Sequence, residues 1–92
     1  MQSYRITVSG MVQGVFFRAS TIDFVRNESL TISGYVRNLP NGKVEILAQG
    51  NEIEVKKLSL WLKNGPQSAR VDETIVEKIE IDVKYKDFSV KY

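Results

Sequence analysis

This chain of 92 residues contains no cysteine and no histidine. Without cysteine it can form neither a disulfide framework nor a thiolate nucleophile, and it offers no thiolate ligand to a metal. Without histidine it has no Ser-His catalytic pair and no ordinary zinc or copper site. It also has no side chain that titrates near neutral pH unless its pKa is shifted. Any chemistry must therefore rely on other side chains or on the backbone.

Long apolar stretches and strong charge are also missing. No segment approaches the ~20 apolar residues needed to cross a bilayer, and the chain opens without an apolar signal region. We therefore expect a cytoplasmic protein with no membrane contact. The net charge of +2 suits a small anionic ligand but does not by itself indicate nucleic acid. The acidic residues are scattered, so we expect no metal site and no cofactor.

Hydrophobic periodicity predicts the order βαββαβ followed by a short fifth strand. The expected elements are a strand over residues 4–9, a helix ending near Asn27, strands over 31–38 and 43–50, a helix over 51–63, and strands over 71–83 and 88–92. Ser20 with Asp23 resembles a capping box for the first helix, and Asn51 with Glu54 caps the second. Leu39-Pro40-Asn41-Gly42 indicates a hairpin turn.

Two split βαβ halves of this kind predict an α+β fold, the ferredoxin-like sandwich, with an antiparallel sheet and both helices on one face. We expect one domain over residues 1–92. The fold alone fixes no function. An RNA-recognition function needs aromatic residues on the central strands, which do not supply them. A metal-transfer function needs cysteines, which are absent.

The segment from Gly10 to Arg18, G-M-V-Q-G-V-F-F-R, joins the first strand to the first helix. Glycines at 10 and 14 permit a backbone that turns successive N–H groups toward one anion, and the arginine adds a planar fork of donors. The pattern predicts a phosphate cradle, although a glycine-bearing turn beside a surface arginine also fits it.

The cradle is not a nucleotide P-loop, because no Gly-Lys-Ser/Thr follows the glycines. Its spacing is similar to the loop of cysteine phosphatases, but Val12 occupies the nucleophile's place. The loop could thus hold phosphate without attacking it. Asn38 ends the core-facing row of the second strand, since Ile32, Gly34 and Val36 share its parity.

Two motifs resemble the signatures of the acylphosphatase family. The first is V-S-G-M-V-Q-G-V-F-F-R, residues 8–18, and the second is G-Y-V-R-N-L-P-N-G-K-V-E-I-L-A-Q-G, residues 34–50. The likeness continues through G-P-Q-S-A-R-V-D, residues 65–72, and F-S-V-K-Y, residues 88–92. One departure lies at residues 26–33, where the connection is longer than usual and lacks a glycine at the helix end.

The resemblance implies the same fold and an enzyme that hydrolyses acyl phosphates to carboxylate and inorganic phosphate. By motif position it assigns substrate phosphate binding to Arg18 and orientation of the attacking water to Asn38. The backbone donors would be the loop N–H groups of Val12, Gln13, Gly14, Val15, Phe16 and Phe17. We expect a monomer, with inorganic phosphate as product and competitive inhibitor. The alternative is a non-catalytic phosphate- or anion-binding regulatory module of the same fold.

Overall fold

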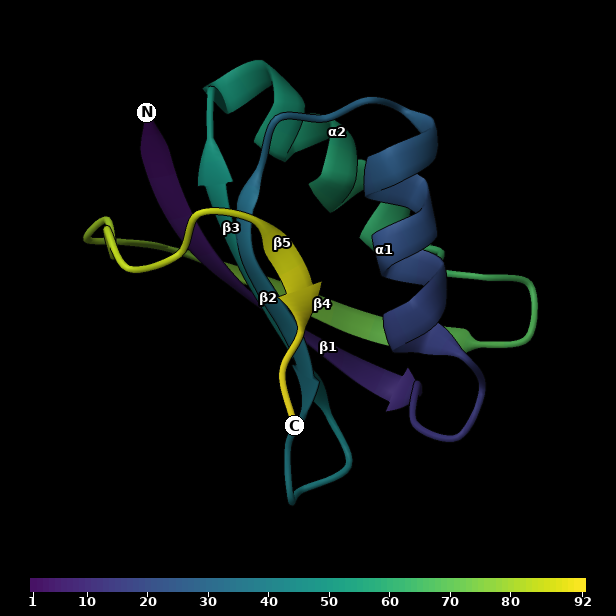
Figure 1. Ribbon diagram of the computed structural model, residues 1–92. Helices are drawn as coiled ribbons and strands as arrows, with labels where there is room; N and C mark the ends of the chain where they lie inside the picture. Colours follow the sequence, from purple (N-terminus) through teal and green to yellow (C-terminus); the bar gives the residue numbers. More distant parts are fainter.

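The computed structural model describes all 92 residues, in five strands and two helices (Figure 1). In chain order these are β1 (Gln2–Met11), α1 (Phe17–Asn27), β2 (Ser33–Asn38), β3 (Val44–Gly50), α2 (Glu52–Leu62), β4 (Arg70–Ile79) and β5 (Phe88–Val90). The order is the predicted one. The predicted β2–β3 hairpin is also present, closed by the Leu39 N–H donating to the Lys43 carbonyl at 2.8 Å.

The strands lie in the order β4-β1-β3-β2-β5, and the first four are antiparallel as predicted. The short β5 differs, because it pairs with β2 in parallel. Ile79 at the end of β4 lies opposite Ser3, at the end of the sheet where β2 also begins. The chain therefore crosses to the start of β2 and runs along it in the same direction, which makes the sheet mixed.

Both helices cover one face of the sheet (Figure 1), so the ferredoxin-like sandwich is confirmed. The strand residues that alternate toward the helices are buried, among them Ile6, Val36 and Ile46. From α2, Leu58 and Leu62 pack into the same core cluster. Burying such side chains is worth about 1.5–3 kcal/mol each, so this face holds the sheet and helices in register.

The two helices begin differently, because a side chain caps α2 and none caps α1. Asn51 caps α2 as predicted, its side chain accepting from the Glu54 N–H at 2.8 Å. The predicted capping box at the start of α1 is wrong, because Ser20 lies inside the helix and no side chain caps it. The residue at the cap position is Phe16, in the left-handed region. A cap side chain would occupy the first N–H groups of α1, which are instead left free.

The end of α1 needs no glycine. Ser29 adopts a φ of 53°, the left-handed conformation that a glycine takes at many helix ends. The Leu30 N–H then donates to the Val25 carbonyl at 3.0 Å, which satisfies one of the last carbonyls of the helix. The longer connection at residues 26–33 is therefore accommodated without displacing α1, which ends at Asn27 as predicted.

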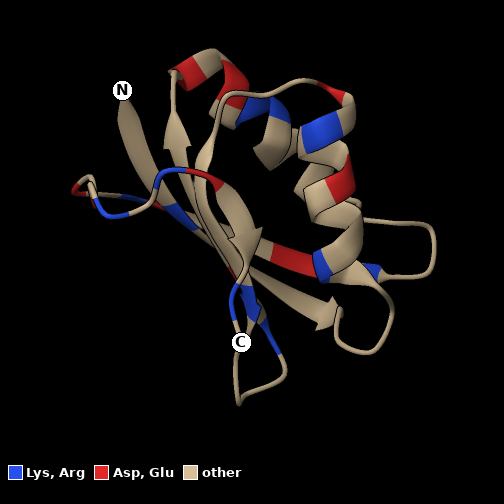
Figure 2. Cartoon of the chain, viewed as in Figure 1, with Lys and Arg blue, Asp and Glu red and all other residues tan.

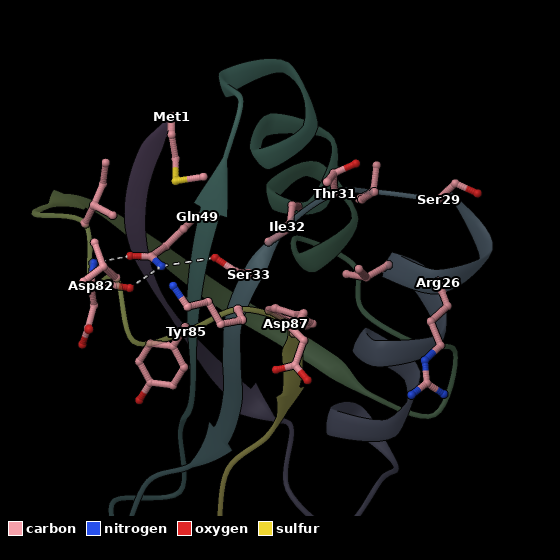
Figure 3. Close-up of a pocket in the computed structure, with 16 residues that line it drawn as sticks. Met1, Arg26, Ser29, Thr31, Ile32, Ser33, Gln49, Asp82, Tyr85 and Asp87 are labelled. Carbon is pink, nitrogen blue, oxygen red and sulfur yellow. Dashed lines mark hydrogen bonds between the residues drawn. The ribbon is translucent and has the colours of Figure 1, made fainter.

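The fourth strand is shorter than predicted, ending at Ile79 rather than Val83. Beyond it, the side chain of Gln49 binds the backbone of Asp82 (Figure 3), accepting from its N–H at 2.6 Å and donating to its carbonyl at 3.0 Å. The Gln49 side chain thus takes the hydrogen bonds that a neighbouring strand would make with Asp82. The chain after Ile79 therefore leaves the edge of the sheet. Ile81 and Val83 consequently lie exposed in a loop.

Candidate active site

Three segments that are distant in sequence meet at one end of the molecule. They are the β1–α1 loop, the β2–β3 hairpin and the residues after β5, and Figure 1 shows them at the end opposite the N-terminus. They meet because β1 and β2 run in the same direction and because β5 is parallel to β2. The ends of β1, β2 and β5 therefore lie at one end of the sheet.

The β1–α1 loop is anchored at both ends and open between them. Val12 and Phe17 are buried in the core, whereas Gly14 and Phe16 are exposed. Gly10 has a φ of 134°, and a Cβ there would stand 2.1 Å from the Arg70 carbonyl oxygen of β4. Gly14 has a φ of 72° with open space around it, so only backbone conformation requires glycine there.

The backbone donors of this loop are free. None of the N–H groups of residues 12–19 donates to a backbone or side-chain acceptor, and the first helical bond of α1 runs from the Ser20 N–H to the Phe16 carbonyl. This run includes all six predicted cradle residues and the first turn of a helix, where the dipole favours an anion. The geometry therefore provides unsatisfied donors beside positive potential.

A pocket of about 320 Å³ lies beside this loop and brings Arg18 and Asn38 together. Its lining comprises Val12, Gly14, Phe16, Phe17, Arg18, Ala19, Asn38, Val90 and Tyr92. The side chains of Gln13 and Val15, the other two predicted cradle residues, do not line it. The predicted water-orienting and phosphate-binding side chains thus share one cavity, although they come from β2 and α1.

The amide of Asn38 has an orphaned atom. Its Oδ1 is buried and has no hydrogen-bond partner. A buried polar atom without a partner costs about 1–3 kcal/mol, and such atoms in native structures call for a ligand, an ion or a water. Because Asn38 lines the same pocket as Arg18, its acceptor is available to a molecule bound there.

Sequence reasoning missed the contacts that hold the loop. The Gln13 Nε2 donates to the carbonyl of Leu39 at 2.8 Å and to that of Lys43 at 2.9 Å, which ties the loop to the hairpin after Asn38. Ser68 donates its hydroxyl to the Val15 carbonyl at 2.7 Å. These pairs are 26 to 53 residues apart in sequence, and no local pattern carries a signal for them.

Tyr92 was also missed as a pocket residue. The Arg18 guanidinium carbon lies 5.2 Å from the centre of its ring, within cation–π distance. Sequence alternation had placed this tyrosine only at the end of the fifth strand. Its contact limits the positions that the guanidinium can take.

The three segments that meet at the pocket carry no acidic residue, although Glu73 of the neighbouring β4 lies opposite Ser9 at the same end of the sheet. Figure 2 shows basic residues on the hairpin turn and the segment after β5, whereas the β1–α1 loop carries no charged residue and is followed by Arg18 in α1. No group of three or more histidine, cysteine, aspartate or glutamate side chains comes together to hold a metal ion. The positive groups that a bound anion would meet here are therefore Arg18 and the free N–H groups.

A larger hollow of about 770 Å³ lies at the opposite end, between the start of β2 and the loop after β4 (Figure 3). It contains none of the predicted site residues. Its central polar group, the Gln49 amide, is already bonded to Ser3, Ser33 and Asp82. The smaller pocket, with its free donors and acceptor, is therefore the candidate site.

The family model for acylphosphatase matches residues 4–90. The chain belongs to the acylphosphatase family. It is 44% identical over 85 residues to a protein named acylphosphatase from Marinobacter nauticus, covering 92% of this chain and 90% of that one. The family resemblance seen in the two sequence motifs is thereby confirmed.

Solved acylphosphatase structures share the fold along the whole chain. The enzyme from Bacillus subtilis aligns with a TM-score of 0.90 at 34% identity and covers 100% of both chains. That from Coxiella burnetii aligns with a TM-score of 0.87 at 40% identity, covering 98% of this chain and 92% of that one. Within this acylphosphatase-family structure, neither helix is long and apolar enough to cross a membrane.

Proposed function

We propose that this chain is an acylphosphatase: it hydrolyses the mixed anhydride between a carboxylate and phosphate by direct attack of water. The observation that carries the proposal is the unpartnered, buried Oδ1 of Asn38, which lines the same pocket as Arg18. Family membership supports the reaction, and the two motif residues supply its binding and positioning groups.

The substrate phosphoryl group binds in the β1–α1 loop. The free N–H groups of residues 12–17 donate to its oxygens, and the Arg18 guanidinium offers two parallel donors to the same group. Phosphoryl transfer passes through a loose transition state with charge on the equatorial oxygens. Donors already in place stabilise that charge without a covalent intermediate, and the buried Val12 offers no nucleophile.

The attacking water is held by the Asn38 amide. This amide is neutral and cannot serve as a base, but its Oδ1 accepts from the water and orients it toward phosphorus. The water oxygen forms a bond to phosphorus as the bridging P–O bond breaks, and that bond's electron pair leaves on the carboxylate. A phosphoryl oxygen takes the proton of the water.

The absence of histidine suits this reaction. The leaving group is a carboxylate whose conjugate acid has a pKa near ~4, so it departs at neutral pH without a proton from a general acid. Arg18 and Asn38 therefore suffice for binding and positioning. Inorganic phosphate carries the same recognised group and is expected to compete with substrate. The expected monomeric state remains a prediction.

The alternative of a non-catalytic anion-binding module finds no support. An anion sensor needs the cradle but has no need of an orphaned amide oxygen beside it. The relatives from Marinobacter nauticus and Geobacter metallireducens and the Bacillus subtilis structure, each matching more than nine tenths of the chain, are named acylphosphatases.

The test is hydrolysis of benzoyl phosphate by the purified chain in water enriched in heavy oxygen. Attack at phosphorus predicts that the heavy oxygen enters phosphate and that benzoate stays unlabelled. Loss of the anhydride no faster than in buffer would contradict the proposed activity. Label in benzoate would show that water attacks the carbonyl carbon, which the geometry proposed here does not provide for.

A further inference from the structure

The pocket beside Arg18 has an apolar mouth. Six of its nine lining residues are hydrophobic, namely Val12, Phe16, Phe17, Ala19, Val90 and Tyr92. Val12 and Phe17 belong to the buried core, whereas the side chains of Phe16 and Tyr92 are 80% and 99% exposed. Two aromatic rings therefore stand at the solvent side of a cavity whose inner groups are Arg18 and Asn38.

Phe16 occupies a position that its side chain does not favour. Its φ of 62° and ψ of 24° lie in the left-handed region, which is unusual for a bulky residue. It is also the cap residue of α1, where a small polar residue or glycine is ordinarily preferred. The chain thus holds a large apolar side chain in a strained conformation and leaves it in solvent. Such strain collects at functional sites.

The acyl group of a bound substrate must pass this mouth. When the phosphoryl group lies against Arg18 and the free N–H groups, the acyl group is attached to it through a single bridging oxygen. Phe16 directly precedes α1 and lines the same pocket, and no acidic residue lies on the three segments around it. Because six of the nine lining residues are hydrophobic, the acyl group meets mainly aromatic and aliphatic surface at this mouth.

We infer that Phe16 is a specificity-determining residue that favours acyl phosphates with an apolar, and above all aromatic, acyl group. Its ring packs against the acyl group at the pocket mouth, and Tyr92 provides a second aromatic surface. Aromatic packing adds to simple burial, so an aryl group gains more from this mouth than a methyl group does. The inference rests on the proposed acyl phosphate hydrolysis and names the substrate class that the site prefers.

The experiment compares kcat/KM for benzoyl phosphate and acetyl phosphate in the wild type and in variants. Phe16→Ala should lower the benzoyl-to-acetyl ratio by about 5- to 10-fold, because the aromatic contact is lost. Both substrates use the same cradle, so any damage to phosphate binding cancels in the ratio. Phe16→Tyr keeps the ring and should keep the ratio.

A second variant separates the ring from the strained backbone. Asparagine tolerates the left-handed conformation better than alanine, so Phe16→Asn should lower the ratio as much as Phe16→Ala does. Met11→Ala is the matched control, since Met11 is 54% exposed near the same loop but does not line the pocket. That control should keep the wild-type ratio.

An unchanged ratio in both Phe16→Ala and Phe16→Asn would overturn the inference and leave the proposed hydrolysis standing. A fall in the alanine variant alone would also overturn it, since the cause would then be the backbone. If the wild type hydrolyses neither substrate, the proposed function fails and the specificity fails with it.

Discussion

At the scale of single residues, Arg18 is the side chain on which the proposed substrate binding depends. Replacing it with alanine should lower kcat/KM by about 1,000-fold and weaken inhibition by inorganic phosphate, because a charge-assisted fork is lost from both the bound and transition states. Arg18→Lys should restore little, since an ammonium is a point charge and not a fork. Steady-state kinetics with phosphate as inhibitor measures both effects. Phosphate inhibition that survives in Arg18→Ala would place the anion elsewhere.

Gln13 is the second single residue with a distinct role, because its side chain positions the β1–α1 loop and does not line the pocket. Its amide bridges the β1–α1 loop to the Leu39 and Lys43 carbonyls. Gln13→Ala should cost about 1–2 kcal/mol of unfolding free energy, measured by urea denaturation, and should lower kcat several-fold as the loop and hairpin lose their tie. The exposed Gln67 gives the matched control, Gln67→Ala. Equal effects of the two substitutions would remove the special role of Gln13.

The sequence predicted some of the pocket and loop residues but not others. Arg18 and Asn38 were predicted because each stands in a motif that resembles a signature of the acylphosphatase family. Gln13 and Tyr92 were not, since their partners are fixed only when the chain folds. Phe16 was predicted for its N–H alone, because the exposure and backbone conformation of its side chain cannot be read from periodicity.

At the scale of elements, the pairing of β2 with β3 places a tyrosine against a carboxylate on the face away from the helices. Tyr35 donates its hydroxyl to Glu45 at 2.7 Å, and Arg37 lies 2.8 Å from the same oxygen. Burial first, and then this hydrogen bond, raise the pKa of Tyr35 from 10.0 to about 12. Deprotonation would set a phenolate against the carboxylate.

This shift predicts how stability depends on pH. Between pH 10 and about pH 12 the unfolded chain releases the Tyr35 proton while the folded chain keeps it, so stability falls as pH rises through this window. Tyr35→Phe should therefore lose less stability than the wild type over the same range, in thermal melts at matched pH. Tyr4→Phe is the control and should behave like the wild type. Parallel curves for the wild type and Tyr35→Phe would contradict the shift.

Element boundaries were predicted where local chemistry sets them. Asn51 begins α2 because its side chain accepts from the Glu54 N–H, a bond between residues three apart. The start of α1 and the end of β4 were misjudged because distant groups decide them. The N–H groups at the start of α1 have no acceptor within the chain and lie beside the candidate pocket, and the Gln49 side chain draws the backbone of Asp82 away from the sheet.

At the scale of the whole molecule, the fold was predicted from strand and helix periodicity, because a two-layer sandwich buries one face of each element. The parallel β5 was not, since its direction depends on which edge of the sheet the chain reaches after β4. The site follows from the topology, because the ends of β1, β2 and β5 meet. No single segment contains it.

The molecule's charge distribution bears on metal dependence. No acidic residue lies on the three segments that form the site, so we predict hydrolysis that needs no divalent cation. Benzoyl phosphate hydrolysis should run at the same rate before and after treatment with a chelator. Activity that disappears on chelation and returns with magnesium or zinc would show that the donor set described here is incomplete.

The central claim is that Arg18 binds the phosphate whereas Asn38 orients the attacking water. One comparison tests it most directly. For wild type, Asn38→Ala and Arg18→Ala, each shown to be folded by thermal melting, kcat for benzoyl phosphate and the inhibition constant for inorganic phosphate are measured together. Asn41→Ala, in the same hairpin, serves as control. Asn38→Ala leaves the cradle intact but loses the oriented water, so kcat should fall by about 100-fold while the phosphate inhibition constant stays near the wild-type value. Phosphate binding lost as severely in Asn38→Ala as in Arg18→Ala would contradict the account, because the amide would then be a ligand contact.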